Sequence, residues 1–143
     1  PLPGVRAQVR ADGSENAHRA ALAAIDLAKG LSLTSLIITH IAIQPPEQSR
    51  MVKAGFDVHA LLEEDAKKSL KRTIDALDQA NITYELKASI GDPSSEVIEI
   101  AKKEHGDLII LGSRGLGAIK GVLMGSVSQK IIQAAPCPVM IVK

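Results

Sequence analysis

The sequence predicts an α/β protein with a single domain: a doubly wound, Rossmann-like sheet of five parallel strands in the order 3-2-1-4-5, with helices on both faces. Strand patterns and helix patterns alternate along the 143 residues. Residues 36–41 and 108–111 are short, largely apolar runs of the kind that a parallel sheet buries on both faces. Parallel strands are joined by right-handed crossovers, which this arrangement satisfies. No repeat or linker interrupts the pattern, so we assign residues 1–143 to one domain.

In the first half of the chain, the sequence predicts a strand, a helix and a second strand, followed by a long connection. Residues 5–11 form the first strand, and the turn Asp12-Gly13-Ser14 follows it. An alanine-rich helix then runs to Gly30, and its small side chains allow close packing on a sheet. The strand at 36–41 stops before a pair of prolines. Residues 44–57 are neither periodic nor strongly apolar, so we expect an irregular surface loop there.

The second half continues the alternation. Residues 58–80 carry an apolar stripe at helical spacing and predict the longest helix, with a solvated outer face of Glu/Lys pairs at i,i+4 in residues 63–68. Residues 82–88 alternate apolar and polar side chains, as in a strand near a sheet edge. Asp92 and Pro93 are typical of a helix start, and Gly106 ends that helix. A strand at 108–111, a loop, a helix at 126–134 and a strand at 139–142 complete the chain.

Composition and charge exclude several classes of protein. The net charge of +1 is too balanced for a protein that coats nucleic acid, and Phe56 and Tyr84 are the only aromatic residues, so base-stacking platforms are missing. No segment is long and apolar enough to span a membrane, and the first residues lack the apolar core of an export signal. The single cysteine, Cys137, is expected to be packed and inert and suits the cytosol, which we take as the compartment.

The glycine-rich loop at residues 112–125 is the candidate functional segment. It holds five of the eleven glycines, between a buried strand and a helix, and residues 108–143 carry four cations and no acid. Backbone without Cβ atoms can adopt φ > 0 and bring several N–H groups to one anion. The helix that follows favours an anion at its N-terminus, where Ser126 either caps the helix or meets a phosphate. This spacing favours a phosphate-binding loop over a flexible connector, while Lys120 either reaches phosphate or only solubilises the loop.

Two common phosphate motifs do not match this loop, because GxxxxGK[ST] is absent and Lys120 stands where GxGxxG needs glycine. The loop instead fits G-x2-G-x9-G-[ST], with Gly112, Gly115, Gly125 and Ser126 at those spacings. Together with this pattern, four other segments make the chain resemble the universal stress protein family over nearly its whole length. These segments are Asp12-Gly13-Ser14 and residues 39–41, 107–115 and 135–142. The complete pattern is typical of the family's ATP-binding branch.

The resemblance implies a site for ATP or AMP, with Mg²⁺ held mainly by the phosphates. It places Asp12 at the ribose or adenine edge, although Asp12 can also be a turn residue or helix cap. Adenine would meet the backbone of Ile41 and the apolar side chains of Ala11 and Leu111. Gly112 would lie beside the ribose, and the phosphates would be surrounded by Ser113, Arg114, Gly115, Gly125, Ser126 and Val127.

One departure from the family lies in the first strand. The family's strand is almost wholly apolar, whereas Arg6, Gln8 and Arg10 alternate here with apolar residues. Buried polar side chains need hydrogen-bond partners, so these three residues leave the register of the strand open.

The histidines do not have the spacing of metal ligands, so we expect no metal held by the protein alone. His18 and His59 are expected on helix surfaces, and His105 complements a helix C-terminus. His40 either packs in the core or lines the cleft.

A sensor or regulator is the leading functional interpretation. Rapid phosphoryl transfer needs a residue that orients the nucleophile and usually a carboxylate for the metal, yet residues 108–143 contain no Asp, Glu or His. We therefore assign no catalytic residue. Two alternatives stay open: a dimeric stress adaptor that works through protein contacts without nucleotide, and a slow ATP hydrolase. The downstream partner is not identified by the sequence.

The last strand predicts a homodimer. In the order 3-2-1-4-5 this strand lies at an edge of the sheet, where its backbone is unpaired. It has no charged side chain that would discourage pairing with another strand before Lys143. Two such edges can pair across a two-fold axis, as the family resemblance also implies. The pairing residues would be Val139, Met140, Ile141 and Val142.

Overall fold

The five strands form one parallel sheet in the predicted order. A computed structural model describes residues 4–30, 33–115, 120–121 and 124–143. The sheet order is β3-β2-β1-β4-β5, so the doubly wound α/β fold is confirmed. The strands are β1 (Val5–Arg10), β2 (Leu33–Ala42), β3 (Glu85–Ile90), β4 (Leu108–Gly112) and β5 (Val139–Val142).

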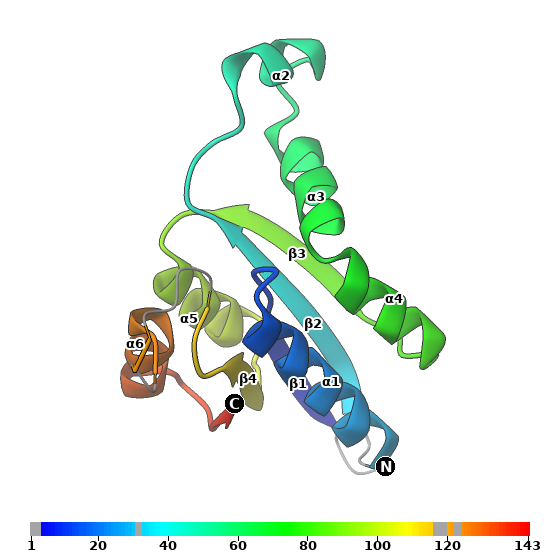
Figure 1. The fold of residues 1–143 in the computed structure, drawn as a ribbon, viewed down its shortest axis with the longest axis vertical. Helices are drawn as coiled ribbons and strands as arrows, with labels where there is room; N and C mark the ends of the chain where they lie inside the picture. Colours follow the sequence, from blue (N-terminus) through cyan, green and yellow to red (C-terminus); the bar gives the residue numbers. More distant parts are fainter. Residues whose placement is uncertain (1–3, 31–32, 116–119, 122–123) are drawn as a thin grey trace.

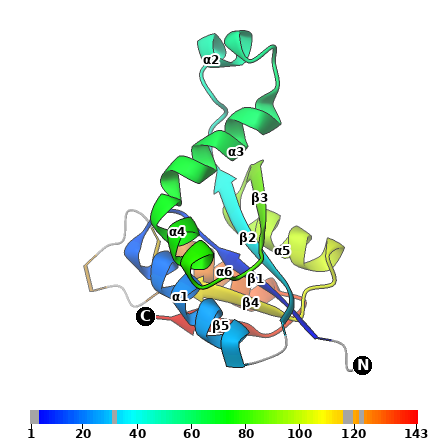
Figure 2. The ribbon, with the colours of Figure 1, turned by 90° about the vertical axis from the view of Figure 1, so that its right-hand side faces the viewer.

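Helices cover both faces of this sheet (Figures 1 and 2). One face carries α1 (Glu15–Gly30), α3 (Val58–Ser69) and α4 (Lys71–Gln79), and the other carries α5 (Pro93–Lys103) and α6 (Ser126–Ala134). The short α2 (Gln48–Lys53) lies beyond the end of α3, away from the sheet (Figure 1). Each layer of helices buries its own apolar cluster against the strands.

Alanines of α1 permit the close packing that the sequence predicts. Ala20, Ala21 and Ala24 are at most 1% exposed and join the cluster that also contains Val9 and Ile110 of the two central strands. A side chain larger than alanine at these positions would push the helix away from the sheet, because the interior is close-packed. The helix begins after Ser14, whose Oγ accepts a hydrogen bond from Ala17 N at 3.2 Å.

The register of β1 is settled by its pairing and by Gln8. Ala7, Val9 and Arg10 lie opposite Leu36, Ile38 and Thr39 of β2. Gln8 is 2% exposed; its Nε2 donates to Val97 O at 3.2 Å, and its Oε1 accepts from Thr39 Oγ1 at 2.8 Å. Both ends of the amide therefore have partners, which offsets the cost of burying it.

The prediction of one continuous helix over residues 58–80 is wrong, because the segment divides at Leu70 into two helices, α3 and α4. Its apolar stripe packs in two places: Leu62 and Ala66 face Ala88 of β3, whereas Leu70 and Leu77 join the cluster beneath α1. The break lets each half bury its own stripe. As a result α1, with 16 residues, is longer than either piece.

Other boundaries also differ from the sequence prediction, and β2 runs from Leu33 to Ala42 rather than over 36–41. The segment at 44–57 contains the helix α2, which buries none of its residues, so the expectation of an entirely irregular loop is wrong. β3 begins at Glu85 rather than at residue 82, and it is an edge strand as predicted. The Glu63–Lys67 and Glu64–Lys68 pairs form on the outer face of α3, also as predicted.

Candidate functional site

The candidate site lies at the carboxyl edge of the two central strands. β1 and β4 are neighbours in the sheet, yet the chain leaves β1 toward β2 on one side and leaves β4 toward β5 on the other. This is the switch point at which doubly wound sheets bind ligands. The turn at residues 12–14 follows β1, and the glycine-rich loop follows β4. Of this loop, residues 116–119 and 122–123 lie outside the described part of the chain.

Asp12 is fixed by hydrogen bonds on both carboxylate oxygens. Its Oδ1 accepts from Ser14 N at 2.9 Å, which closes the turn, and its Oδ2 accepts from Arg10 Nη1 at 3.2 Å. The two side chains are sheltered, with 12% of Asp12 and 16% of Arg10 exposed. Asp12 is thus a turn residue whose second oxygen is directed toward the candidate site.

Gly112 allows β4 to approach the first turn of α1. A Cβ atom there would lie 2.6 Å from Asn16 C and 2.8 Å from Ala17 N, which no real side chain tolerates. Next to it, Asn16 Nδ2 donates to Ser113 Oγ at 3.4 Å. The glycine at the start of the loop is therefore required by packing between α1 and β4.

Gly115 faces the Arg10–Asp12 pair. A Cβ atom at Gly115 would lie 2.5 Å from Asp12 Oδ2 and 3.4 Å from Arg10 Nη1. The loop backbone at Gly115 therefore passes close to the charged groups at the end of β1, with no space for a side chain between them. Asp12 and Gly115 are far apart in the sequence, and the structure brings these two predicted site residues together.

The loop is closed by a backbone hydrogen bond from Gly125 N to Ser113 O, at 2.8 Å. Ser128 Oγ donates to Gly112 O at 2.9 Å and anchors α6 to the end of β4. These bonds hold the N-terminus of α6 beside residues 113–115. Gly125 is the N-cap, with φ −75° and ψ 163°, so Ser126 is the first helical residue rather than the cap and its side chain is exposed.

The glycines at 112, 115 and 125 do not use a left-handed backbone. Among the described glycines of this loop, only Gly121 has a positive φ, of 87°. The expectation that φ > 0 would explain the glycines is therefore wrong for these three. Gly112 and Gly115 are explained by close approach, whereas a Cβ at Gly125 would meet its nearest neighbour, Arg114 Cα, at an ordinary 3.7 Å.

The apolar residues expected near adenine lie on two faces of the sheet. Ala11 is 2% exposed and packs beneath α1, while Ile41 and Leu111 belong to the cluster beneath α5 and α6, with Val127 partly buried beside them. The backbone of Ala11 is also engaged, because His40 Nδ1 donates to Ala11 O at 2.9 Å. The side chain of His40, a residue of β2, is therefore held against the end of β1 at the candidate edge.

Ser113 is more enclosed than the sequence suggests. It is 6% exposed, its N–H donates to Val142 O at 2.8 Å, and its Oγ accepts from Asn16. Its neighbour Arg114 is only partly buried. Ser113 therefore ties the start of the loop to β5 through its N–H and to α1 through its hydroxyl.

Sequence reasoning missed three residues that build this site: Arg10, Asn16 and Ser128. The signal for Arg10 was present in the sequence, because a charged residue stands near the end of a strand that is expected to be buried. Asn16 and Ser128 lie in the first turns of α1 and α6, where polar side chains are common and carry no distinguishing pattern.

Metal-binding groups, the free thiol and membrane-spanning helices are three further features on which the described residues can be assessed. In the part of the chain that the structure describes, no group of three His, Cys, Asp or Glu side chains is placed to hold a metal ion. Cys137 is partly buried, and this burial raises the pKa of its thiol. None of the described helices has both the length and the apolar character needed to cross a membrane.

Fold and site together define a doubly wound α/β protein with a glycine-rich loop at its switch point. Residues 8–143 match the model of the universal stress protein family, so the chain belongs to that family. A similar relative is universal stress protein YxiE of Bacillus subtilis, which is 30% identical over 143 aligned residues that cover 94% of this chain and 96% of the relative.

Two solved structures extend the comparison. The structure of the hypothetical protein MJ0577 has a TM-score of 0.76 and 26% identity, covering 97% of this chain and 95% of that one. MJ0577 is a universal stress protein of Methanocaldococcus jannaschii. A universal stress protein in complex with cAMP has a TM-score of 0.69 and 25% identity, covering 98% and 97% of the two chains.

Proposed function

We propose that this chain is a regulatory domain that binds an adenine nucleotide, ATP or AMP, at the carboxyl edge of β1 and β4. The observation that carries the proposal is the convergence of the Asp12 turn, the loop at residues 112–115 and the N-terminus of α6 at the switch point of the sheet. An anion is stabilised at a helix N-terminus. The similar protein that binds cAMP supports the choice of an adenine nucleotide.

Each group at the edge has a role in this proposal. The phosphates lie at Ser113, Arg114 and Gly115 on one side and at Gly125, Ser126 and Val127 on the other. Asp12 and Gly112 face the ribose, and adenine contacts the backbone of Ile41 and the ends of the strands at Ala11 and Leu111. Mg²⁺ is held mainly by the phosphates, whose charge it neutralises.

The same geometry favours binding over fast turnover. Asp12 is a carboxylate that faces the loop at Gly115, and its two oxygens are engaged by Ser14 N and Arg10 Nη1. A general base must be free to accept a proton from the attacking water, so Asp12 is poorly placed for that role. Slow ATP hydrolysis is the alternative activity, and a turnover assay with purified protein distinguishes it from simple binding.

The decisive experiment asks which ligand the protein holds. Freshly purified protein is denatured and the released small molecules are identified by mass spectrometry, and the emptied protein is then titrated with Mg-ATP and AMP by calorimetry. Release or binding of an adenine nucleotide supports the proposal. Protein that releases none and binds neither ligand would favour the stress adaptor, which works through protein contacts alone.

We also propose that β5 forms a homodimer, in the cytosol. β5 is an edge strand; Pro138 O accepts a hydrogen bond from Ile109 N of β4, and Val142 O accepts one from Ser113 N, the residue after β4. Because neighbouring residues of a strand point their backbone groups in opposite directions, the N–H groups of Val139 and Ile141 point outward, where an antiparallel partner strand can accept them.

The dimer is tested at Ile141. Ile141→Pro removes an outward N–H, and Ile141→Ala is the matched control that trims the side chain but keeps the N–H. Light scattering at micromolar concentration should give a dimer for the parent and for Ile141→Ala, and a monomer for Ile141→Pro. A monomeric parent would show that this interface is wrong.

A further inference from the structure

Arg10 is a charged residue at a position where the fold calls for an apolar one. It is the last residue of β1, a central strand that lies between β2 and β4. The other polar residues of β1 have partners on the α5 side: Gln8 donates to Val97 O, and Arg6 Nη1 donates to Glu104 O at 3.2 Å. Arg10 instead turns its guanidinium to the carboxyl edge of the sheet, where it meets Asp12.

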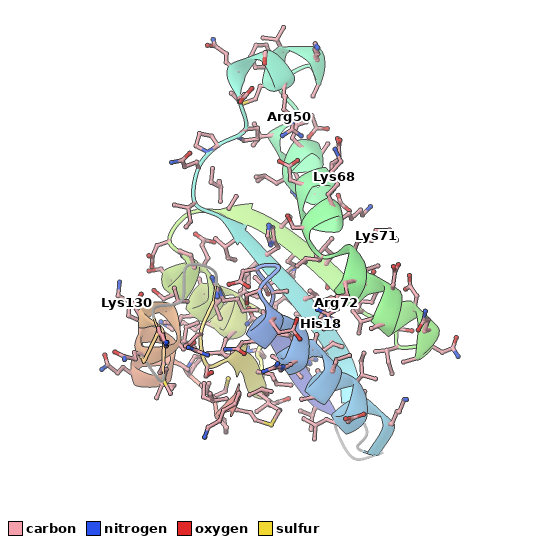
Figure 3. The ribbon with its side chains drawn as sticks, in the orientation of Figure 1. His18, Arg50, Lys68, Lys71, Arg72 and Lys130 are labelled. Carbon is pink, nitrogen blue, oxygen red and sulfur yellow. The ribbon has the colours of Figure 1, made fainter. Side chains whose placement is uncertain are left out.

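The contact between Arg10 and Asp12 uses a small part of the guanidinium. A single hydrogen bond of 3.2 Å joins Nη1 to Asp12 Oδ2, and this is the one hydrogen bond that the guanidinium makes within the described residues. Arg50, labelled in Figure 3, shows the alternative: its two terminal nitrogens bind both oxygens of Asp65, at 3.0 and 2.8 Å. A guanidinium has five N–H donors, so Arg10 can bind Asp12 and still donate to a second acceptor.

The environment of this guanidinium strengthens its attraction for an anion. Arg10 is 16% exposed, and a charge sheltered from water interacts more strongly than one at the surface. A Cβ atom at Gly115 would lie 3.4 Å from Nη1, so the loop backbone passes close to the guanidinium, and the loop there is held by the Gly125–Ser113 hydrogen bond. An anion that binds the backbone at Gly115 is therefore within reach of Arg10.

We propose that Arg10 binds the phosphate group nearest the ribose while it holds Asp12 in place, so that the site selects phosphorylated adenosines over adenosine. This inference rests on the nucleotide site proposed above. Asp12 is assigned there to the ribose, so a cation bonded to Asp12 lies close to the first phosphate of the chain. Arg10 then contributes equally to AMP, ADP and ATP, because all three carry that phosphate.

The test measures the affinity of four ligands, adenosine, AMP, ADP and ATP, for the parent and three variants by calorimetry. Arg10→Ala removes the side chain, and Arg10→Gln keeps a side chain able to donate to Asp12 but lacks the charge. Arg6→Gln is the matched control at the other end of the same strand. A charge-assisted hydrogen bond predicts a loss of about 10- to 100-fold for each phosphorylated ligand in both Arg10 variants. Adenosine binding by Arg10→Gln, and every affinity of Arg6→Gln, should stay within a factor of about three of the parent. Arg10→Ala, which also releases Asp12, should weaken adenosine less than it weakens the three phosphorylated ligands.

Other results would overturn the inference. Equal weakening of adenosine and AMP would show that Arg10 only positions Asp12. Unchanged AMP binding in folded Arg10→Gln would show that the charge is not used. Thermal unfolding of each variant establishes that it is folded. If Arg10→Ala does not fold, Arg10→Gln provides the test instead.

Failure of the nucleotide site is recognised separately. If the parent binds none of the nucleotides, the proposed function is wrong, and an NMR titration with inorganic pyrophosphate then decides the role of Arg10. Shifts of the Asp12 and Gly115 amides in the parent that are absent in Arg10→Gln would support an anion site. No shift in the parent would refute it.

Discussion

Replacing each of three loop glycines by alanine separates folding from binding, because the three sites leave different space for a Cβ atom. At Gly112 the new atom would meet backbone of α1 at 2.6–2.8 Å. Backbone cannot rotate away as a side chain can, so β4 and α1 must separate. Overpacking of this kind costs about 1–3 kcal/mol, and we expect the upper end here. For a chain of this size, that is a fall in melting temperature of about 10 °C.

Gly115→Ala and Gly125→Ala should behave differently. The Cβ at Gly115 would meet Asp12 Oδ2 at 2.5 Å, and this carboxylate can swing aside by giving up its bond to Arg10. We expect a stability loss of about 1 kcal/mol, the usual value of one hydrogen bond. At Gly125 the nearest atom would be 3.7 Å away, so only the poorer N-cap preference of alanine remains, a cost below about 1 kcal/mol.

Binding should rank these variants in another order. Gly115→Ala displaces Asp12 and fills the wall of the proposed site, so it should weaken nucleotide more than Gly125→Ala does. Chemical unfolding and calorimetry on the same preparations measure both quantities. If Gly112→Ala is as stable as the parent, or if all three variants lose equal stability, the close-approach explanation of the loop is refuted.

Three further predictions concern charge. His18 is buried, and its Nδ1 shares a hydrogen bond of 2.9 Å with Thr73 Oγ1. Burial, together with the cation of Arg72 beside it (Figure 3), lowers the pKa of His18 below 6.5. The unfolded chain therefore takes up the proton more readily, so stability should fall as the pH drops below about 6.5, and His18→Gln should flatten that part of the curve while exposed His59→Gln should not. Hydrogen bonds from the side chain of Ser94 and from Ser95 lower the pKa of Asp92 to about 2, so its stabilisation of α5 should persist until the pH falls through 3.8 toward 2, and Asp92→Asn should remove that step in acid unfolding curves. Arg114→Ala should weaken ATP by about 1–3 kcal/mol more than adenosine, as expected for a charge-assisted hydrogen bond, and calorimetry that finds equal losses would assign Arg114 to loop structure instead.

Local patterns in the sequence determined most of the secondary structure. α6 and β5 have the predicted bounds, because a glycine, a helical stripe and an apolar run mark their ends within a few residues. The glycine spacing of residues 112–125 also indicated a phosphate loop. Alternating strands and helices implied a doubly wound parallel sheet, since right-handed crossovers leave few arrangements.

Contacts between distant segments decided the rest. The helix break at Leu70 depends on which cluster each half of the stripe meets, and Gln8 is tolerated in the core because Thr39 and Val97 happen to face its amide. His18 was expected on a helix surface and is buried, because α4 packs over that face of α1.

The site shows the same division. Its glycines could be read from the sequence, but the reason for them could not: Gly112 is required by the backbone of Asn16 and Ala17 in α1, and Gly115 is favoured by the Asp12 side chain. Such requirements arise only when the fold brings the segments to within a few ångströms. A periodic pattern records which side of an element is buried, whereas the partner, the distance and the hydrogen bond belong to the tertiary structure.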